Sequence, residues 1–162
     1  MAEVETFSQL VEGPIPPLEA EPASGATGAQ LLFQGIVRDE ENGEPIVALF
    51  YEAYAEMAEK ELRNVCDEAG RLYQLQRLQV WHRIGDVPVN EASLQIVMRS
   101  RHRETGLEAM AWLIREIKQR LPIWKWGIAP DGRRFPSAHG EHDHAPATEH
   151  ELSAKDMRGG RN

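Results

Sequence analysis

The sequence predicts an α+β fold: a mostly antiparallel sheet with two main helices packed on one face, a hammerhead-like arrangement. Runs with alternating apolar residues come mostly in adjacent pairs, which favours antiparallel strands. Two longer stretches space their apolar residues by threes and fours, as amphipathic helices do. The resulting order is β-β-α-β-β-α with a short final strand, so both helices can cover the same sheet.

The first part of the chain predicts a loose segment followed by a hairpin. Residues 1–28 hold four prolines and a weak apolar start near Phe7, so any strand there should be short and the segment partly flexible. Residues 29–38 are a strand in which Gly35 marks a bulge or a close approach. A turn at residues 39–45, with Asn-Gly at its centre, then joins this strand to the β-rich residues 46–54.

The middle of the chain predicts a helix and two more strands. Residues 56–69 have helical apolar spacing, and Gly70 is expected to end that helix. Residues 77–84 and 92–99 alternate as strands do, with His82 on the apolar face of the first. A histidine in this position is more often a satisfied core or rim residue than a ligand.

The second helix is predicted over residues 104–120. A capping box from Thr105 to Glu108 is expected to begin it, Pro122 lies beyond its end, and the apolar residues that follow supply the final strand. The helix should bury one stripe, made of Leu107, Met110, Ile114, Ile117 and Leu121. The ordered domain is therefore expected to span residues 29–135, followed by a polar, His-rich tail over residues 136–162 that we expect to be disordered.

Composition limits the function. The net charge of −8 argues against general nucleic-acid binding, and no apolar run approaches the roughly 20 residues that cross a bilayer. A single cysteine and an N-terminus unlike a signal peptide favour the cytoplasm. Residues 99–134 nevertheless carry nine Lys or Arg against four acids. This basic segment indicates a local anion site, although a solvated helix face of mixed charge would look the same.

Two lysines and several basic residues are the candidates for chemistry. Lys118 lies beside the apolar stripe of the second helix, and Lys125 stands between two tryptophans, where partial desolvation would suit proton transfer or nucleophilic attack. The alternative is that both ammonium groups reach water. His102 and Arg103 lie at a strand-to-helix junction, a setting that binds phosphate. Arg38 follows Gly35 and can pair with an anion.

Two other features are weaker candidates. Cys66 falls on the apolar side of the first helix, so it is expected to be a core residue and not a nucleophile. The tail histidines could chelate a metal, and an unrelated anion-binding or metal-storage protein would use them; they are His139, His142, His144 and His150.

Five segments in register resemble the catalytic (large) subunit family of molybdopterin synthase. They are FQGIVRD (33–39), YEAYAEMAEKEL (51–62), HRIGDVPVNEASL (82–94), RHRETGLEA (101–109) and LPIWK (121–125). The resemblance covers about residues 29–135. It implies a sulfurtransferase of molybdenum cofactor biosynthesis that converts cyclic pyranopterin monophosphate to molybdopterin, with no bound cofactor or metal.

The resemblance also implies partners and site residues. A homodimer of this chain would bind a small ubiquitin-like carrier at each end, giving a heterotetramer, and the carrier's C-terminal Gly-Gly thiocarboxylate would supply the sulfur. The catalytic residues would be Lys118 and Lys125. The substrate-binding residues would be Ile36, Val37, Arg38, His102, Arg103, Trp126 and Gly127.

Three departures from the family pattern stand out. Gly127 occupies a position that is usually acidic, Asn90 replaces a usual glycine, and the His-rich tail matches nothing in the family. Asn tolerates positive φ better than most residues, so the turn at Asn90 should survive. The departure at Gly127 leaves a second hypothesis open: a non-catalytic relative that only docks the sulfur carrier.

Overall fold

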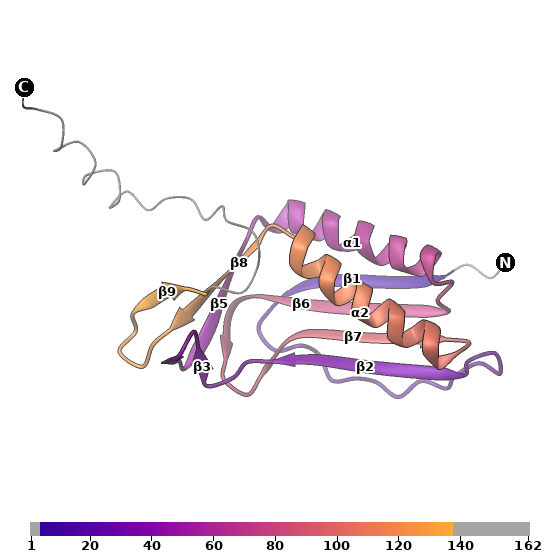
Figure 1. Ribbon diagram of the computed structural model, residues 1–162, viewed down its shortest axis with the longest axis horizontal. Helices are drawn as coiled ribbons and strands as arrows, with labels where there is room; N and C mark the ends of the chain where they lie inside the picture. The colour runs from indigo at the N-terminus through magenta and orange to yellow at the C-terminus, as the bar shows by residue number, and fades with distance from the viewer. Residues whose placement is uncertain (1–3, 138–162) are drawn as a thin grey trace, which may run out of the picture.

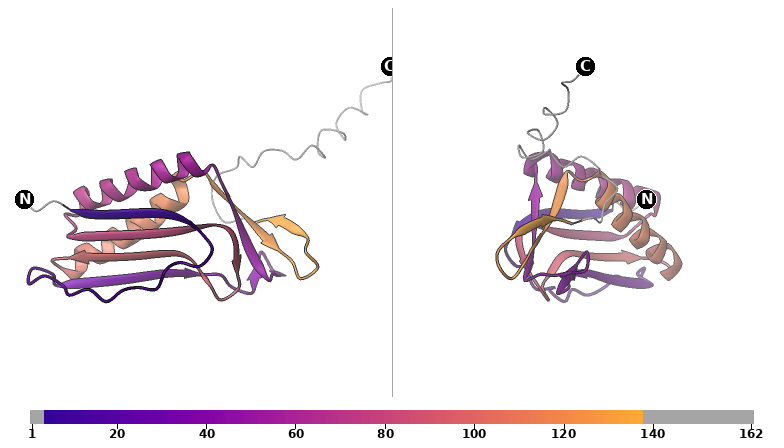
Figure 2. Two further views of the ribbon diagram at one scale, coloured as in Figure 1. Left: turned by 180° about the vertical axis from the view of Figure 1, so that it is seen from behind. Right: turned by 60° about the vertical axis from the view of Figure 1, so that its left-hand side comes forward.

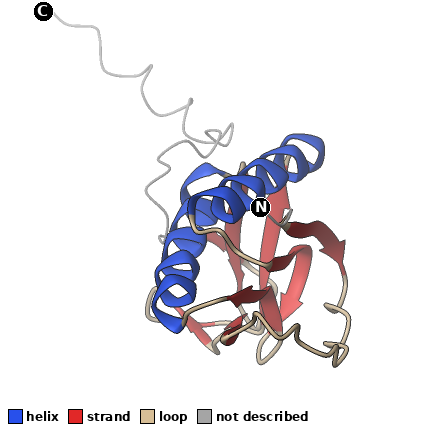
Figure 3. Ribbon diagram, turned by 90° about the vertical axis from the view of Figure 1, so that its right-hand side faces the viewer, coloured by secondary structure: helices blue, strands red, loops and turns tan. Residues whose placement is uncertain are grey.

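The computed structural model describes residues 4–137, which form a seven-stranded sheet, a small two-stranded hairpin and two helices (Figure 1). The predicted α+β class is confirmed: every strand pair is antiparallel except β1 with β6, and both helices cover one face (Figure 3). The elements are β1 (Glu5–Glu12), β2 (Ala29–Ile36), β3 (Glu40–Glu41), β4 (Glu44–Pro45), β5 (Ala48–Ala53), α1 (Ala55–Leu72), β6 (Arg77–Pro88), β7 (Ala92–Ser100), α2 (Arg103–Arg120), β8 (Ile123–Ile128) and β9 (Arg134–Pro136).

β6 joins two parts of the sheet. Residues 77–84 pair in parallel with β1, whereas residues 85–88 pair in antiparallel with β5. Gly85, at the change of partner, has a φ of 79°, a conformation that glycine adopts without a steric penalty. Beyond this point β5, β8 and β9 cross the other strands steeply at one end of the molecule, as Figures 1 and 2 show.

β1 is longer than the short strand expected near Phe7. It pairs with β6 over eight residues, with Thr6, Ser8 and Leu10 half-buried. Thr6 donates a hydrogen bond to Asp67 of α1 over 2.9 Å. Because hydroxyl side chains occupy two of these positions, the apolar alternation that would have revealed the strand is hidden.

β2 and β5 do not form the expected hairpin. β2 pairs with β7, which places Leu31 opposite Met98, and β5 pairs with β6 and β8. The turn at Asn42 and Gly43 does form, with positive φ at both residues, but it closes only β3 and β4. A turn signal fixes its immediate neighbours, whereas a longer strand takes the partner that buries its apolar face.

α1 buries the face that its apolar spacing predicts, namely Ala58, Leu62, Val65, Cys66 and Ala69. The expected stop at Gly70 is wrong, because the helix continues to Leu72. Gly70 serves packing instead: a Cβ there would lie 3.0 Å from Cγ1 of Val4, so the glycine lets the chain leading into β1 lie close to the helix.

α2 is rotated relative to its predicted stripe. Leu107 is 59% exposed, and no side chain caps the helix, whose N-cap residue is His102, so the capping box is also wrong. A Cβ at Gly106 would lie 2.7 Å from Leu31 and from Ser100, which makes Gly106 the point of closest approach to the sheet. The helix therefore buries Gly106, Ala109, Met110, Leu113 and Ile117. Neither helix in residues 4–137 is long and apolar enough to cross a membrane.

Arg120 fixes the end of α2 onto α1. Its guanidinium lies 2.8 Å from the carboxylate of Glu61 and 2.7 Å from that of Glu68. Two charge-assisted contacts to one guanidinium hold the last turn of the helix in a single orientation. Pro122 then directs the chain into β8, so the residues around this turn have fixed positions.

Candidate active site

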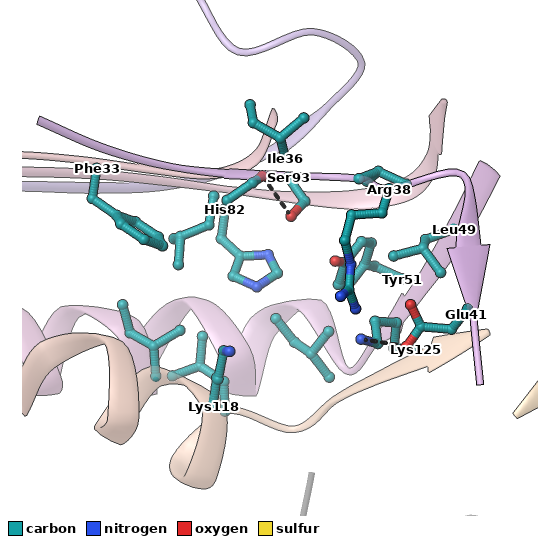
Figure 4. Close-up of a pocket in the computed structure, with 16 residues that line it drawn as sticks. Phe33, Ile36, Arg38, Glu41, Leu49, Tyr51, His82, Ser93, Lys118 and Lys125 are labelled. Carbon is teal, nitrogen blue, oxygen red and sulfur yellow. Dashed lines mark hydrogen bonds and ion pairs between the residues drawn. The ribbon is translucent and has the colours of Figure 1, made fainter. Parts of the chain in front are cut away.

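A cavity of about 260 Å³ lies between the sheet and the C-terminal end of α2 (Figure 4). It forms where the main core, under the helices, meets a smaller apolar cluster around Val37, Leu49 and Val87. The change of partner along β6 separates these two cores and leaves the space between them. Five of the residues predicted for the site line it: Ile36, Val37, Arg38, Lys118 and Lys125.

Lys118 projects from the last turns of α2 at the rim of the cavity. Its neighbour Ile117 is 2% exposed, whereas Lys118 itself is exposed, so the lysine lies at the edge of the buried face as predicted. Within residues 4–137, no carboxylate lies within ion-pair distance of its ammonium. The fixed orientation of Arg120 two residues later holds this turn, so Lys118 is presented to the cavity from a rigid element.

Lys125 enters the cavity from β8. Its Nζ lies 3.0 Å from Oε1 of Glu41, and its side chain is 23% exposed. The two tryptophans do not flank the ammonium, because consecutive residues of a strand point to opposite faces. Trp124 packs edge-on against Tyr54, and Trp126 donates a hydrogen bond to Glu52 over 3.0 Å. The partial burial of Lys125 was therefore predicted for the wrong reason.

Trp126 and Gly127 follow Lys125 but are not among the residues that line the cavity. Gly127 is paired with Phe135 of β9. A Cβ at Gly127 would lie 2.5 Å from the Phe135 ring, so the departure from an acidic residue has a packing cause. Phe135 in turn covers the smaller apolar cluster.

Arg38 lies just beyond β2, after the irregularity that the sequence predicted. The register of β2 with β7 shifts between Gly35 and Ile36, and two backbone hydrogen bonds of Val37 hold the chain next to Glu91 and Asn90. Asn90 has a φ of 72°, so it adopts the left-handed turn as expected. Figure 4 shows the Arg38 side chain pointing into the cavity.

His102 and Arg103 lie elsewhere. They stand at the junction of β7 and α2, as predicted, and both are exposed. Arg103 precedes Lys118 by fifteen residues of one helix, which separates the two by about 22 Å along its axis. Within a single chain, therefore, the His-Arg pair cannot contact a small molecule bound beside Lys118.

Several polar groups of the cavity were not predicted as site residues: Glu41, Tyr51, His82 and Ser93. Glu41 sits in an acidic turn that looks solvated in the sequence. The sequence did place His82 on the apolar face of its strand, but this position favoured a core role over a role in the site. The tail histidines lie outside the described residues.

His82 is neutral, with a defined tautomer. It is 8% exposed, and its Nδ1 lies 2.8 Å from the backbone carbonyl oxygen of Arg83. Because a carbonyl only accepts, Nδ1 carries the proton and Nε2 keeps its lone pair. Burial lowers the pKa of His82 below its usual value, and the hydrogen bond to Arg83 opposes this only in part.

The lowered pKa predicts an acid-side loss of stability. Below about pH 6.5 the unfolded chain binds a proton at His82 that the folded chain does not, so the free energy of unfolding falls as the pH falls toward the folded-state pKa. Urea denaturation between about pH 5 and pH 7 measures this slope. His82→Asn can keep a donor to Arg83 without titrating, and it should flatten the slope; an unchanged slope would contradict the assignment.

Cys66, the single cysteine, is outside the cavity. It is 1% exposed within the main core, as predicted. Burial, together with the charge of Asp67, raises the pKa of its thiol to about 12. The thiol is therefore protonated at neutral pH and is not a nucleophile.

Fold and cavity together define a class of protein: a small α+β protein in which Arg38, Lys118 and Lys125 line one cavity between the sheet and the end of α2. The comparisons with known proteins name the family. Residues 10–120 match the model of the MoaE protein family, and the chain belongs to that family.

Relatives and solved structures agree with this membership. The molybdopterin synthase catalytic subunit of Culex quinquefasciatus is 44% identical over 121 residues, covering 74% of this chain and 75% of that protein. The same subunit of Pyrococcus abyssi is 39% identical over 110 residues, covering 68% and 74%. The structure of molybdopterin synthase from Staphylococcus aureus has a TM-score of 0.65 at 32% identity, covering 75% of this chain and 93% of that one.

A further solved structure contains two kinds of subunit. The complex of subunits 1 and 2 of molybdopterin-converting factor from Helicobacter pylori is similar to this chain, with a TM-score of 0.58 at 27% identity. The similarity covers 70% of this chain and 74% of that one. That relative therefore forms a complex with a second subunit.

Proposed function

We propose that this chain is the catalytic subunit of a molybdopterin synthase, a sulfurtransferase that converts cyclic pyranopterin monophosphate to molybdopterin. The observation that carries the proposal is the convergence of Arg38, Lys118 and Lys125 on one cavity from three separate elements. These are residues that the family motifs assign to substrate and catalysis. Glu41 offsets one of the three cations, so the cavity keeps a net positive charge that suits a phosphorylated substrate.

The three cations have different proposed roles. Arg38 pairs with the phosphate, because a guanidinium presents several donors in a fixed plane. Lys118 has no carboxylate partner in the described residues, so it acts on the thiocarboxylate or as a general acid or base. Lys125 stabilises negative charge that develops as the cyclic phosphate opens. No bound metal or cofactor has a part in the proposed reaction, and the proposed location is the cytoplasm.

The sulfur donor in this proposal is a small ubiquitin-like carrier whose C-terminal Gly-Gly ends in a thiocarboxylate. The complex of two subunits from Helicobacter pylori supports a small partner. A cavity of about 260 Å³ admits a thin chain terminus but no folded domain, which fits delivery by a flexible tail. The basic segment of residues 99–134 supplies positive charge that attracts both anionic partners.

His102 and Arg103 join this proposal through a second copy of the chain. They are exposed and about 22 Å from Lys118 along α2, so they reach a substrate only from another subunit. A homodimer in which each subunit presents its His-Arg pair to its partner's cavity gives two complete sites. Two carriers would then complete a heterotetramer.

Reconstitution tests the proposed function. Purified chain is mixed with cyclic pyranopterin monophosphate and a thiocarboxylated carrier, and formation of the dithiolene product is measured, with the uncharged carrier as the control. Product that requires the thiocarboxylate is the expected result. Carrier binding without product would instead identify a non-catalytic relative that only docks the carrier. The absence of both product and carrier binding would contradict both hypotheses.

A further inference from the structure

Glu41 is a buried carboxylate in the wall of a cavity whose other charged residues are the cations Arg38, Lys118 and Lys125. It lies in β3 of the small hairpin, is 4% exposed and contributes to the cavity wall. Carboxylates are rarely buried unless they are paired, because removing the charge from water is costly. A negative charge at this point also opposes the binding of an anion. Its presence therefore needs a reason other than substrate affinity.

The contacts of Glu41 converge on Lys125. Its Oε1 lies 3.0 Å from the Lys125 Nζ and also accepts a hydrogen bond from the Ser137 hydroxyl. Burial would raise the pKa of Glu41, but the hydrogen bonds from Ser137 and Lys125 and the charges of Lys125 and Arg38 together lower it below its usual value. Glu41 is thus ionised at neutral pH and forms a true ion pair.

The hairpin that carries Glu41 is itself held in place. The Asn42 side chain donates to the carbonyl oxygen of Pro136 over 3.3 Å, and the Ser137 backbone N–H donates to that of Lys125 over 2.9 Å. Ser137 therefore touches both members of the ion pair, one through its side chain and the other through its backbone. These hydrogen bonds hold the hairpin, and with it the Glu41 carboxylate, in position beside Lys125.

We propose that Glu41 is a positioning residue for Lys125: its carboxylate fixes the Lys125 ammonium within the cavity, at some cost in affinity for the anionic substrate. A lysine side chain has four rotatable bonds and no planar head group, so without a partner its ammonium samples many positions. The effect on turnover rests on the proposed function, whereas the effect on affinity rests only on the charge of the cavity.

The proposal makes affinity and turnover change in opposite senses. Glu41→Gln keeps the shape of the side chain and removes its charge. Calorimetry with cyclic pyranopterin monophosphate should show a dissociation constant lower by roughly two- to fivefold, because the variant lacks the negative charge that repels the substrate phosphate. In the product assay, kcat should fall on the order of tenfold to a hundredfold, because Lys125 has lost its anchor.

Matched variants separate positioning from a structural role. Glu44→Gln removes another carboxylate of the same hairpin, one that pairs with Arg133 and does not line the cavity, and should change neither quantity. Glu41→Asp keeps the charge and should recover most of kcat. In a Lys125→Ala background, Glu41→Gln should leave kcat unchanged, since a positioning residue acts only through the group that it positions.

Two results would overturn the proposal. One is weaker pterin binding by Glu41→Gln together with a lowered melting temperature, which would show a structural role. The other is an equal loss of kcat with and without Lys125. A wild-type chain that binds the pterin but makes no product would refute the proposed function instead, and the comparison of dissociation constants would still test the charge of Glu41.

Discussion

Lys118→Ala is expected to remove most turnover while leaving the fold intact. Lys118 is exposed on α2 and pairs with no carboxylate in the described residues, so its loss breaks no ion pair there. Alanine also favours a helix more than lysine does. If Lys118 acts in proton transfer or on the thiocarboxylate, its removal should lower kcat by about 10²- to 10⁴-fold. The dithiolene product assay measures this loss, and thermal melting checks the fold.

Gln119→Ala is the matched control for this prediction. Gln119 is the next residue of the same helix, is also exposed and does not line the cavity, so its replacement should leave both kcat and the melting temperature near wild type. If Lys118→Ala keeps near-normal turnover, the catalytic assignment of Lys118 is wrong. A large drop in its melting temperature would mean that the residue acts on stability.

Mixing two inactive variants is expected to restore activity if each site draws on two subunits. Arg103→Ala and Lys118→Ala should each be strongly impaired alone. After subunits exchange at equal concentration, about half of the dimers contain one of each, and every such dimer has one intact site of two. Activity should therefore return to about a quarter of the wild-type value. The product assay, run before and after exchange, measures the recovery.

Arg101→Ala provides the comparison for Arg103→Ala, because Arg101 is an exposed arginine two residues earlier that the family motif does not assign to substrate. The Arg101→Ala variant should be active in the product assay on its own, without mixing with a second variant. Two different affinity tags, purified in sequence, show whether mixed dimers have formed. Mixed dimers without recovered activity would mean that Arg103 does not complete the partner's cavity.

Elements of the fold could be predicted from the sequence because their signals are local. The buried face of α1 follows from periodicity alone, and alternation along β7 places Leu94, Ile96 and Met98 in the main core, where they lie. The partner of β2 could not be predicted, because pairing with β7 depends on contacts far apart in the chain. The rotation of α2 was missed for a related reason: Gly106 sets it through contacts with Leu31 and Ser100, which no local pattern contains.

The site likewise contains residues that could be predicted from the sequence and one, Glu41, that could not. Family motifs located Arg38, Lys118 and Lys125, and the structure brings these three together. Glu41 was missed because neighbouring acids make its segment look like an ordinary solvated turn. Its burial arises from Ser137, almost a hundred residues later, and from Lys125. A carboxylate becomes part of a site through its neighbours in space, and these are not visible in its own segment of sequence.

The burial of Cys66 determines how the enzyme can handle sulfur. The chain has no other cysteine, so no exposed thiol exists on which a sulfur atom could be stored between turnovers. In the proposed reaction no thiol of this chain carries the sulfur, so each sulfur passes from the carrier's thiocarboxylate to the pterin. Synthesis would stop as soon as charged carrier is exhausted, and control over the flow of sulfur would lie with the reactions that recharge the carrier.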